Sequence, residues 1–439
     1  MIRRLPLTFK HIMYNLRGGF LVRPLCITLV LGMLGGALSY FEEIFPALSA
    51  WVPATLFPSK SDPQVAQIIL SDISTSVMTV VSIVFAILLM SLTLASMQFS
   101  PRIIVSFSRD KVTQWILGIF LGTFSYCIAV LPAARTKPYA FSPVLSVFGA
   151  MVLVLACVIG LLFFIHHISR AISVNFIVDR IAGETELMID EFMAQPISQK
   201  LWPIGSSGEE HAKLEVPLSH TMSGYICFID TNRLVEIAKR HQLKVKVLKR
   251  VGQFIPAGVA LMHISREERL TDNVRKALLS TFDIGAMRTL QQDVEFGVLQ
   301  IVDIALKAIS PAVNDPSTAI SCIDQLSRVL GRFAMRQTPS SYYYDPPGII
   351  RVSVPWIEFD ALLESAFDQI RLYARADMAV SLRILRALHD IAEISKNPEV
   401  YTSLLALGQR TIDSCTGHLD AMSMQRLHQR MDELKSIAR

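Results

Sequence analysis

Two carboxylates, Asp303 and Asp315, are the residues of this chain that come closest to an acid–base couple. General acid–base catalysis needs titratable groups whose pKa values are matched to the proton that each one moves. The plainer interpretation is that Asp303 lies on a helix face and Asp315 caps the next helix. We favour this second interpretation, because Asp315 is followed directly by Pro316, which is a strong signal for the start of a helix.

Asp315 belongs to the stretch KAISPAVNDPSTA, which joins two segments that read as amphipathic helices. Pro311 disfavours continuation of the first helix, and Asn314 tolerates unusual backbone angles. The stretch therefore predicts a corner between two helices. We expect it to lie at a packing corner or a contact between subunits, through Pro311, Asn314, Asp315 and Pro316.

Sequence motifs of the common enzyme classes are absent: there is no HExxH, no Walker-type phosphate loop, no GxGxxG and no GxSxG. The six cysteines form no CxxC pair and have no metal-type spacing. We therefore expect no enzyme activity, no catalytic residue, no metal and no cofactor. The net charge of +5 comes without a dense Lys/Arg stripe, so we expect no nucleic-acid partner.

Composition indicates a membrane domain followed by a soluble domain. The chain is 51% hydrophobic, and its long apolar runs are concentrated in the first third. Each of four runs has about the 20 residues that a helix needs to cross the hydrocarbon core. The predicted spans are 24–41, 73–97, 112–131 and 144–165, within a transmembrane domain over residues 1–170.

The positive-inside rule orients these spans. Lysines and arginines are more numerous before the first span and between the second and third than in the two opposite loops. This pattern places the N-terminus, the loop between the second and third spans, and everything after His166, including the C-terminus, in the cytoplasm. The first span lacks a clear cleavage site after it, so we expect it to be retained as an anchor.

The second span has a narrow stripe of small and hydroxyl-bearing residues on one helical face. Its positions are Ser71, Thr75, Thr79, Ser82, Ala86, Leu89, Thr93 and Ser96. One interpretation is close helix packing, which small residues allow in lipid. The other is a pore lining in which Leu89 forms an apolar constriction that gates by dewetting.

Other residues of the membrane half carry weaker signals. Gly32 and Gly36 have the GxxxG spacing of a helix contact. The carboxylates Glu42, Glu43 and Asp72 read either as an acidic outer vestibule or as solvated interface groups. At the inner end of the second span, Gln98, Pro101 and Arg102 read either as an interface anchor or as the point that couples the pore helix to the cytosolic domain.

The cytoplasmic half is predicted to be mainly helical. Residues 171–220 read as a connecting helix and linker, 221–265 as a small β module, and 266–439 as a helical domain. The helices expected in the last region cover 265–279, 294–310, 315–333, 356–374, 378–395 and 400–439, with two short strands between 340 and 355. The β module resembles barrel-sandwich folds that carry lipoyl or biotinyl groups, although their exposed modification lysine is absent.

Three features resemble a bacterial family of predicted inner-membrane proteins, the domain-of-unknown-function family 2254. They are the motif ASMQFSPR, the segment FGVLQIVDIALKAISPAVNDPSTA, and the arrangement of four spans followed by a cytoplasmic domain. The family implies this architecture over nearly the whole chain but brings no activity with it.

Two functions of different classes remain open. The first is an oligomeric channel for ions or small solutes, whose partners are the lipid bilayer and further copies of the chain. Its plan is similar to that of bestrophin-type channels at the level of the fold alone. The second is a non-conducting membrane sensor or assembly scaffold that acts through its cytoplasmic domain.

Overall fold

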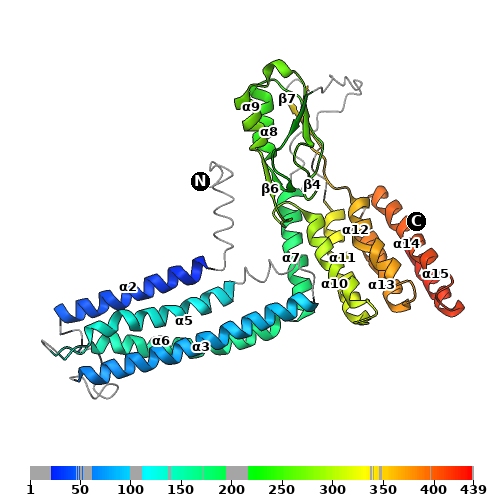
Figure 1. Cartoon of the computed structure of the whole chain (residues 1–439). Coiled ribbons are helices and arrows are strands. Elements are labelled where there is room, and N and C mark those ends of the chain that lie inside the picture. The colour runs from blue at the N-terminus through cyan, green and yellow to red at the C-terminus, as the bar shows by residue number, and fades with distance from the viewer. Residues whose placement is uncertain are drawn as a thin grey trace. The chain divides into compact units, whose positions relative to one another are not determined.

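The structure is a computed structural model. It describes residues 21–45, 47, 49, 52, 62–98, 111–136, 140–171, 173–193, 216–336, 339, 341–345, 349–395 and 397–437, without the side chains of 94–98 and 171. The chain divides into two compact units, residues 1–173 (unit 1) and 174–439 (unit 2). Figure 1 shows the elements of each unit, and each unit is described by itself.

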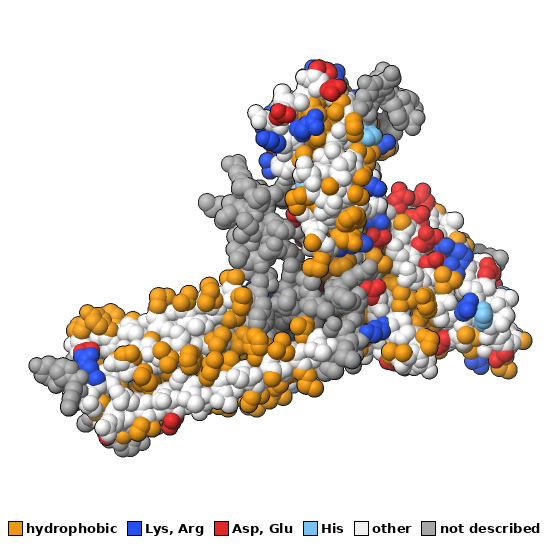
Figure 2. Space-filling view, viewed as in Figure 1, with side chains coloured by type: hydrophobic (Ala, Val, Ile, Leu, Met, Phe, Trp, Pro, Cys, Tyr) orange, Lys and Arg blue, Asp and Glu red, His pale blue; other side chains and the backbone are white. Residues whose placement is uncertain are grey.

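Unit 1 contains four long helices that lie side by side (Figure 1). They are α2 (Val22–Ile44), α3 (Pro63–Gln98), α5 (Lys111–Val130) and α6 (Val144–Ala171), with a short 3₁₀ turn, η3 (Leu131–Ala133), after α5. All four are long and apolar enough to cross a membrane, which confirms the prediction of four spans by length and composition. Hydrophobic side chains are spread along the visible face of these helices (Figure 2).

α2, α3 and α6 extend beyond the predicted spans, whereas α5 matches its predicted span to within one residue at each end. α3 starts at Pro63, ten residues before the expected start at 73, and α6 continues to Ala171 instead of ending at 165. The physical reason at the start of α3 is local. Pro63 occupies the first helical position and the Asp62 side chain accepts a hydrogen bond from the Gln64 amide at 2.9 Å. A hydropathy window measures the apolar run and does not detect this cap.

Glycines bring α2 and α5 close together. A Cβ on Gly35 would lie 2.9 Å from the Tyr126 carbonyl oxygen, and a Cβ on Gly122 would lie 2.4 Å from Leu31. Gly32 lies against Ser125, whereas Gly36 has open space around it. The helix contact is therefore made by Gly32 and Gly35, and not by the Gly32–Gly36 pair that the GxxxG spacing suggested.

Unit 2 contains a small sheet region. A five-stranded sheet has the order β1-β5-β3-β8-β7, and a three-stranded sheet has the order β4-β2-β6. Neighbouring strands are antiparallel except for the β3–β8 pair. The strands are β1 (Val216–Ser219), β2 (Gly224–Ile229), β3 (Val245–Val247), β4 (Phe254–Ile255), β5 (Ala260–Ile264), β6 (Phe282–Gly285), β7 (Tyr342–Asp345) and β8 (Ile349–Ser353).

The two sheets and two short helices share one apolar core. The helices are α8 (Thr231–Arg240) and α9 (Asp272–Leu279), and the 3₁₀ turn η4 (Glu267–Arg269) precedes α9. The hairpin β7–β8 lies at the two short strands expected between 340 and 355. Val245 in β3 pairs with Val352 in β8, so a segment about a hundred residues later in the chain completes the five-stranded sheet.

The rest of unit 2 is helical (Figure 1). The helices are α7 (Val174–Met193), α10 (Val294–Ala308), α11 (Pro316–Ala334), α12 (Phe359–Tyr373), α13 (Met378–Ile394), α14 (Pro398–Cys415) and α15 (Ala421–Ser436). The single helix expected over 400–439 is therefore two helices. Gly417 has a φ of +80° and the Asp420 side chain accepts a hydrogen bond from the Ser423 amide, so one helix ends and another is capped within a few residues.

Ion pairs join α7 to α11. Asp190 on α7 accepts hydrogen bonds from Arg332 at 2.8 and 2.6 Å and from Arg336 at 2.7 Å. One turn of α11 earlier, Arg328 contacts Asp179 and Glu186. Arg328 and Arg332 are four residues apart on one face of α11, and Arg336 follows just after the end of the helix at Ala334.

Candidate functional site

The predicted stripe on α3 is exposed on the outside of unit 1. Seven of its eight positions have described side chains, and all seven are exposed: Ser71, Thr75, Thr79, Ser82, Ala86, Leu89 and Thr93. Ser96 belongs to α3, but its side chain lies outside the described residues. The periodicity that the sequence shows is therefore present as a continuous face of the helix.

The opposite face of α3 packs against its own unit. Leu70, Val77, Val81 and Val84 are buried, and α3 contacts both α5 and α6. Because the apolar face is occupied within the chain, the stripe is not needed for packing among the four helices. It is left exposed on the surface of unit 1.

Hydroxyl groups of the stripe are bonded within the helix. Thr79 donates to the carbonyl of Thr75 at 2.9 Å, Ser82 to that of Met78 at 3.0 Å, and Thr93 to that of Leu89 at 2.8 Å. This bonding lowers the cost of holding the groups next to hydrocarbon. Each oxygen still has a lone pair that can accept from water or from a hydrated cation.

The predicted coupling residues lie at the edge of the described chain. α3 ends at Gln98, whose side chain lies outside the described residues, as do Pro101 and Arg102. The coupling of α3 to the cytosolic domain at this point stays a prediction.

The KAISPAVNDPSTA stretch forms a corner between α10 and α11. Asn314 has a φ of +49°, and its amide donates to the Ser310 carbonyl at 2.9 Å. The Asp315 carboxylate accepts from the Thr318 amide at 3.2 Å and from the Thr318 hydroxyl at 2.6 Å. Pro311 and Asn314 are exposed, while Asp315 and Pro316 are partly buried. These hydrogen bonds are local to the corner, and a role as a subunit contact stays a prediction.

The Asp315 carboxylate acts as a hydrogen-bond acceptor. The hydrogen bonds from the Thr318 hydroxyl and amide lower the pKa of Asp315, so its carboxylate is ionised at neutral pH. A general acid needs the opposite shift. The geometry fits the interpretation of Asp315 as a helix cap.

We expect Asp315→Ala to lower the free energy of unfolding by about 1 kcal/mol, the usual effect of losing a helix cap. Asp315→Asn should keep most of this stability, because Asn is an equally preferred cap. Thermal unfolding of the purified chain in detergent measures both. Equal losses in the two variants would contradict the capping role.

Glu42 is neither a vestibule group nor a solvated carboxylate. It is 1% exposed and accepts hydrogen bonds from the amide of Leu145 at 2.7 Å and from the amide and hydroxyl of Ser146 at 3.1 and 3.0 Å. These groups begin α6, so Glu42 caps that helix from a distant part of the chain. Glu43 is paired with Arg135, and Asp72 is exposed on α3.

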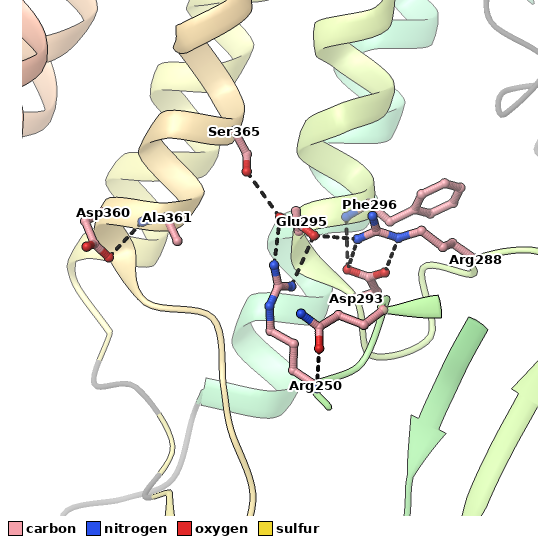
Figure 3. Close-up of polar contacts among 9 residues, drawn as sticks. Arg250, Arg288, Asp293, Glu295, Phe296, Asp360, Ala361 and Ser365 are labelled. Atoms are coloured by element: carbon pink, nitrogen blue, oxygen red, sulfur yellow. Dashed lines mark hydrogen bonds and ion pairs between the residues drawn. The ribbon is translucent and has the colours of Figure 1, made fainter. Parts of the chain in front are cut away.

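A charged cluster in unit 2, formed by Arg250, Arg288, Asp293 and Glu295, was not predicted from the sequence. Figure 3 shows Arg250 and Arg288 directed at Glu295, the second residue of α10. Arg250 donates to both oxygens of Glu295 at 3.1 and 2.9 Å, and Arg288 donates at 2.8 Å. Ser365 on α12 adds a fourth hydrogen bond at 3.2 Å.

Asp293 completes this cluster at the start of α10. Its carboxylate accepts from Arg288 at 2.7 and 2.8 Å and caps α10 through the Phe296 amide at 3.1 Å. The Arg288 guanidinium also lies 5.6 Å from the centre of the Phe296 ring. Gly252, with a φ of +86°, lets the backbone pass so closely that a Cβ there would meet Asp293 at 2.3 Å.

In this cluster the positive charges of the arginines are paired with the negative charges of the carboxylates. Burial acts to raise the pKa of Glu295, but the hydrogen bonds and charge of Arg250, and then those of Arg288, outweigh it and lower the pKa to about 2. Burial likewise acts to lower the pKa of Arg288, and Asp293 and Glu295 raise it. The cluster joins the loops after β3 and β6 to α10 and α12. Every charge in it has a partner, so it is a structural junction and does not offer a free charge to a ligand.

One group of described residues has the composition of a metal site. His389, Asp390 and Glu393 have ligand atoms within 4.8 Å of one another. All three lie on the single helix α13, and Arg386 approaches Asp390 to 3.9 Å, which opposes the binding of a cation. We assign no metal to this group.

Comparison with known proteins places the chain among membrane proteins. A model of the family described as "Predicted membrane protein (DUF2254)" matches residues 17–390. The uncharacterized proteins Mb1321c of Mycobacterium bovis and Rv1290c of Mycobacterium tuberculosis are 30% identical to it over 349 residues, which is 76% of this chain. The matched region spans 65% of the length of these relatives. No solved structure gives a significant match.

Proposed function

The chain belongs to the DUF2254 family of predicted membrane proteins, and on that premise we propose that its copies assemble in a bacterial inner membrane as an oligomeric channel for ions or small solutes. The α3 helices of the copies face a common axis, with their stripes toward it. Both termini and unit 2 lie in the cytoplasm. The proposal assigns the chain no enzymatic role.

One observation carries this proposal: the α3 stripe is exposed on the face of the helix opposite to the one that packs within the unit. Hydroxyl groups gain nothing from contact with lipid, whereas water in a pore bonds to them. Leu89 is 55% exposed on the same face, so a ring of leucines from several copies would form an apolar constriction.

A non-conducting scaffold is the second candidate. The i−4 hydrogen bonds of Thr79, Ser82 and Thr93 satisfy their hydroxyls without water. Small residues also allow two α3 helices to approach closely, which gives a dry contact between copies. In that case unit 2 would carry the function through partners of its own.

Cysteine cross-linking tests the arrangement that both candidates share. Cys26, the exposed native cysteine, is first replaced by Ser; the other five cysteines are buried. We expect Ser82→Cys, close to the centre of the stripe, to cross-link between copies in native membranes under mild oxidation. Ile83→Cys is the matched control, because Ile83 is also exposed on α3 but points about 85° away from the centre of the stripe at 100° per residue. Cross-linking of Ile83→Cys alone, or of neither variant, would contradict stripe-to-stripe assembly.

A further inference from the structure

An apolar groove of about 460 Å³ lies between α5 and α6 on the surface of unit 1. Its volume is within the roughly 300–1,000 Å³ usual for small-molecule sites. Ala156 and Gly160, one turn apart on α6, provide the space, since a Cβ on Gly160 would meet only Ile116, at 3.9 Å. Trp115 and Phe163, both more than half exposed, also line the groove.

Lys111, the first residue of α5, is the one charged residue among the described residues of the lining, and the end of unit 1 where it lies is basic. The directions of the helices decide which charged residues share this end. α2 and α5 run parallel, as the Ile27–Gly118 and Leu31–Gly122 contacts show. α6 runs antiparallel to them, since Gly149 lies against Tyr126 and Gly160 against Ile116. The described charges at this end are Arg23, Lys111 and Arg170. The described carboxylates of unit 1 lie toward the other end: Glu42, Glu43, Asp62 and Asp72.

We propose that this groove binds one acyl chain of an anionic phospholipid, whose phosphate pairs with Lys111. The apolar lining matches the hydrocarbon chain, and a lysine at the end of a membrane helix extends its amine to headgroup depth. A second copy of unit 1 offers no described carboxylate at this end, so a lipid phosphate is the better partner for the basic charge. The inference does not depend on whether the protein conducts.

Fluorescence quenching in reconstituted vesicles tests the site, because Trp115 lines the groove. The full chain keeps Trp115, while Trp51, Trp202 and Trp356 are replaced by Phe. Brominated phosphatidylglycerol or brominated phosphatidylcholine is then mixed at equal fractions into phosphatidylcholine vesicles. We expect phosphatidylglycerol to bind with about fivefold preference, the factor that one lysine near the membrane surface provides.

Two variants separate the charge from the groove. Lys111→Gln should abolish the preference for phosphatidylglycerol, whereas Arg170→Gln, at the same end but outside the lining, should keep it. Gly160→Leu should fill the groove and weaken quenching by both lipids, whereas Gly36→Leu adds the same bulk where α2 has open space and should change nothing. Equal quenching by the two lipids in the parent protein would overturn the proposal, as would a preference that survives Lys111→Gln. The absence of quenching by either lipid would mean that another copy covers the groove, and would also overturn it.

Discussion

Replacement of Glu295 by Gln should lower the free energy of unfolding of unit 2 by roughly 3 kcal/mol at neutral pH. The change removes a negative charge that faces Arg250 and Arg288 in a partly buried cluster. The pKa of Glu295 is lowered from 4.5 to about 2, and each pKa unit corresponds to about 1.4 kcal/mol. Removal of one partner also leaves two arginines without their shared carboxylate, which is the costly way to break a buried ion pair.

The same shift predicts how stability depends on pH. The pKa of Glu295 is lower in the folded protein than in the unfolded chain, so its contribution is fully present above about pH 4.5. It is lost as the pH falls from about 4.5 toward 2, because the unfolded chain then binds the proton first. The unfolding temperature of the parent chain in detergent should fall over this range more steeply than that of Glu295→Gln.

Asp190→Asn provides the matched control, because Asp190 also accepts three hydrogen bonds from arginines. Its side chain is 33% exposed, compared with 13% for Glu295, so solvent screens its ion pairs. We expect a loss of less than about 1 kcal/mol. A loss at Asp190 as large as that at Glu295 would show that burial of the Glu295 cluster adds nothing.

Leu89→Ser should raise the conductance of the assembled protein about tenfold, which corresponds to lowering the barrier by about 1.4 kcal/mol. Leu89 is the large apolar side chain among the otherwise small residues of the stripe, and a ring of leucines excludes water from a narrow pore. Serine would extend the hydroxyl-lined surface through this level. Currents of the parent and the variant in planar bilayers, at equal protein density, measure the ratio.

Met90→Ser is the control for this prediction. Met90 is 66% exposed next to Leu89 on α3 but points about 65° away from the centre of the stripe at 100° per residue. The substitution has the same chemistry and depth, and it should leave the conductance unchanged. An equal increase in both variants would point to a general loosening of the membrane domain.

Local signals explain what the sequence predicted well. The four membrane helices follow from long apolar runs, and the corner at Asn314–Asp315 follows from the preferences of Asn, Asp and Pro for helix ends. The stripe on α3 was visible because its positions repeat at the helical period. Which face of α3 packs within the unit was not visible, since Val77, Val81 and Val84 are not distinguishable by type from the exposed apolar residues around them.

Long-range pairs account for what the sequence did not show. Glu42 caps α6 from about a hundred residues away, and Arg250 reaches Glu295 across 45 residues. Both carboxylates are ordinary surface types in isolation, and only the fold gives them buried donors. The Asp-Val-Glu sequence before the apolar run of α10 was a usable sign of a helix start, but it did not indicate the two arginines.

The central claim, that α3 lines a conducting pore, is tested most directly by current through Ser82→Cys in planar bilayers. The variant is made in the Cys26→Ser background, and a charged, water-soluble thiol reagent is added during recording. We predict discrete currents that the reagent reduces in Ser82→Cys and leaves unchanged in Ile83→Cys. Silence of the parent protein and of Leu89→Ser under all conditions, or currents in Ser82→Cys that the reagent does not affect, would contradict the claim.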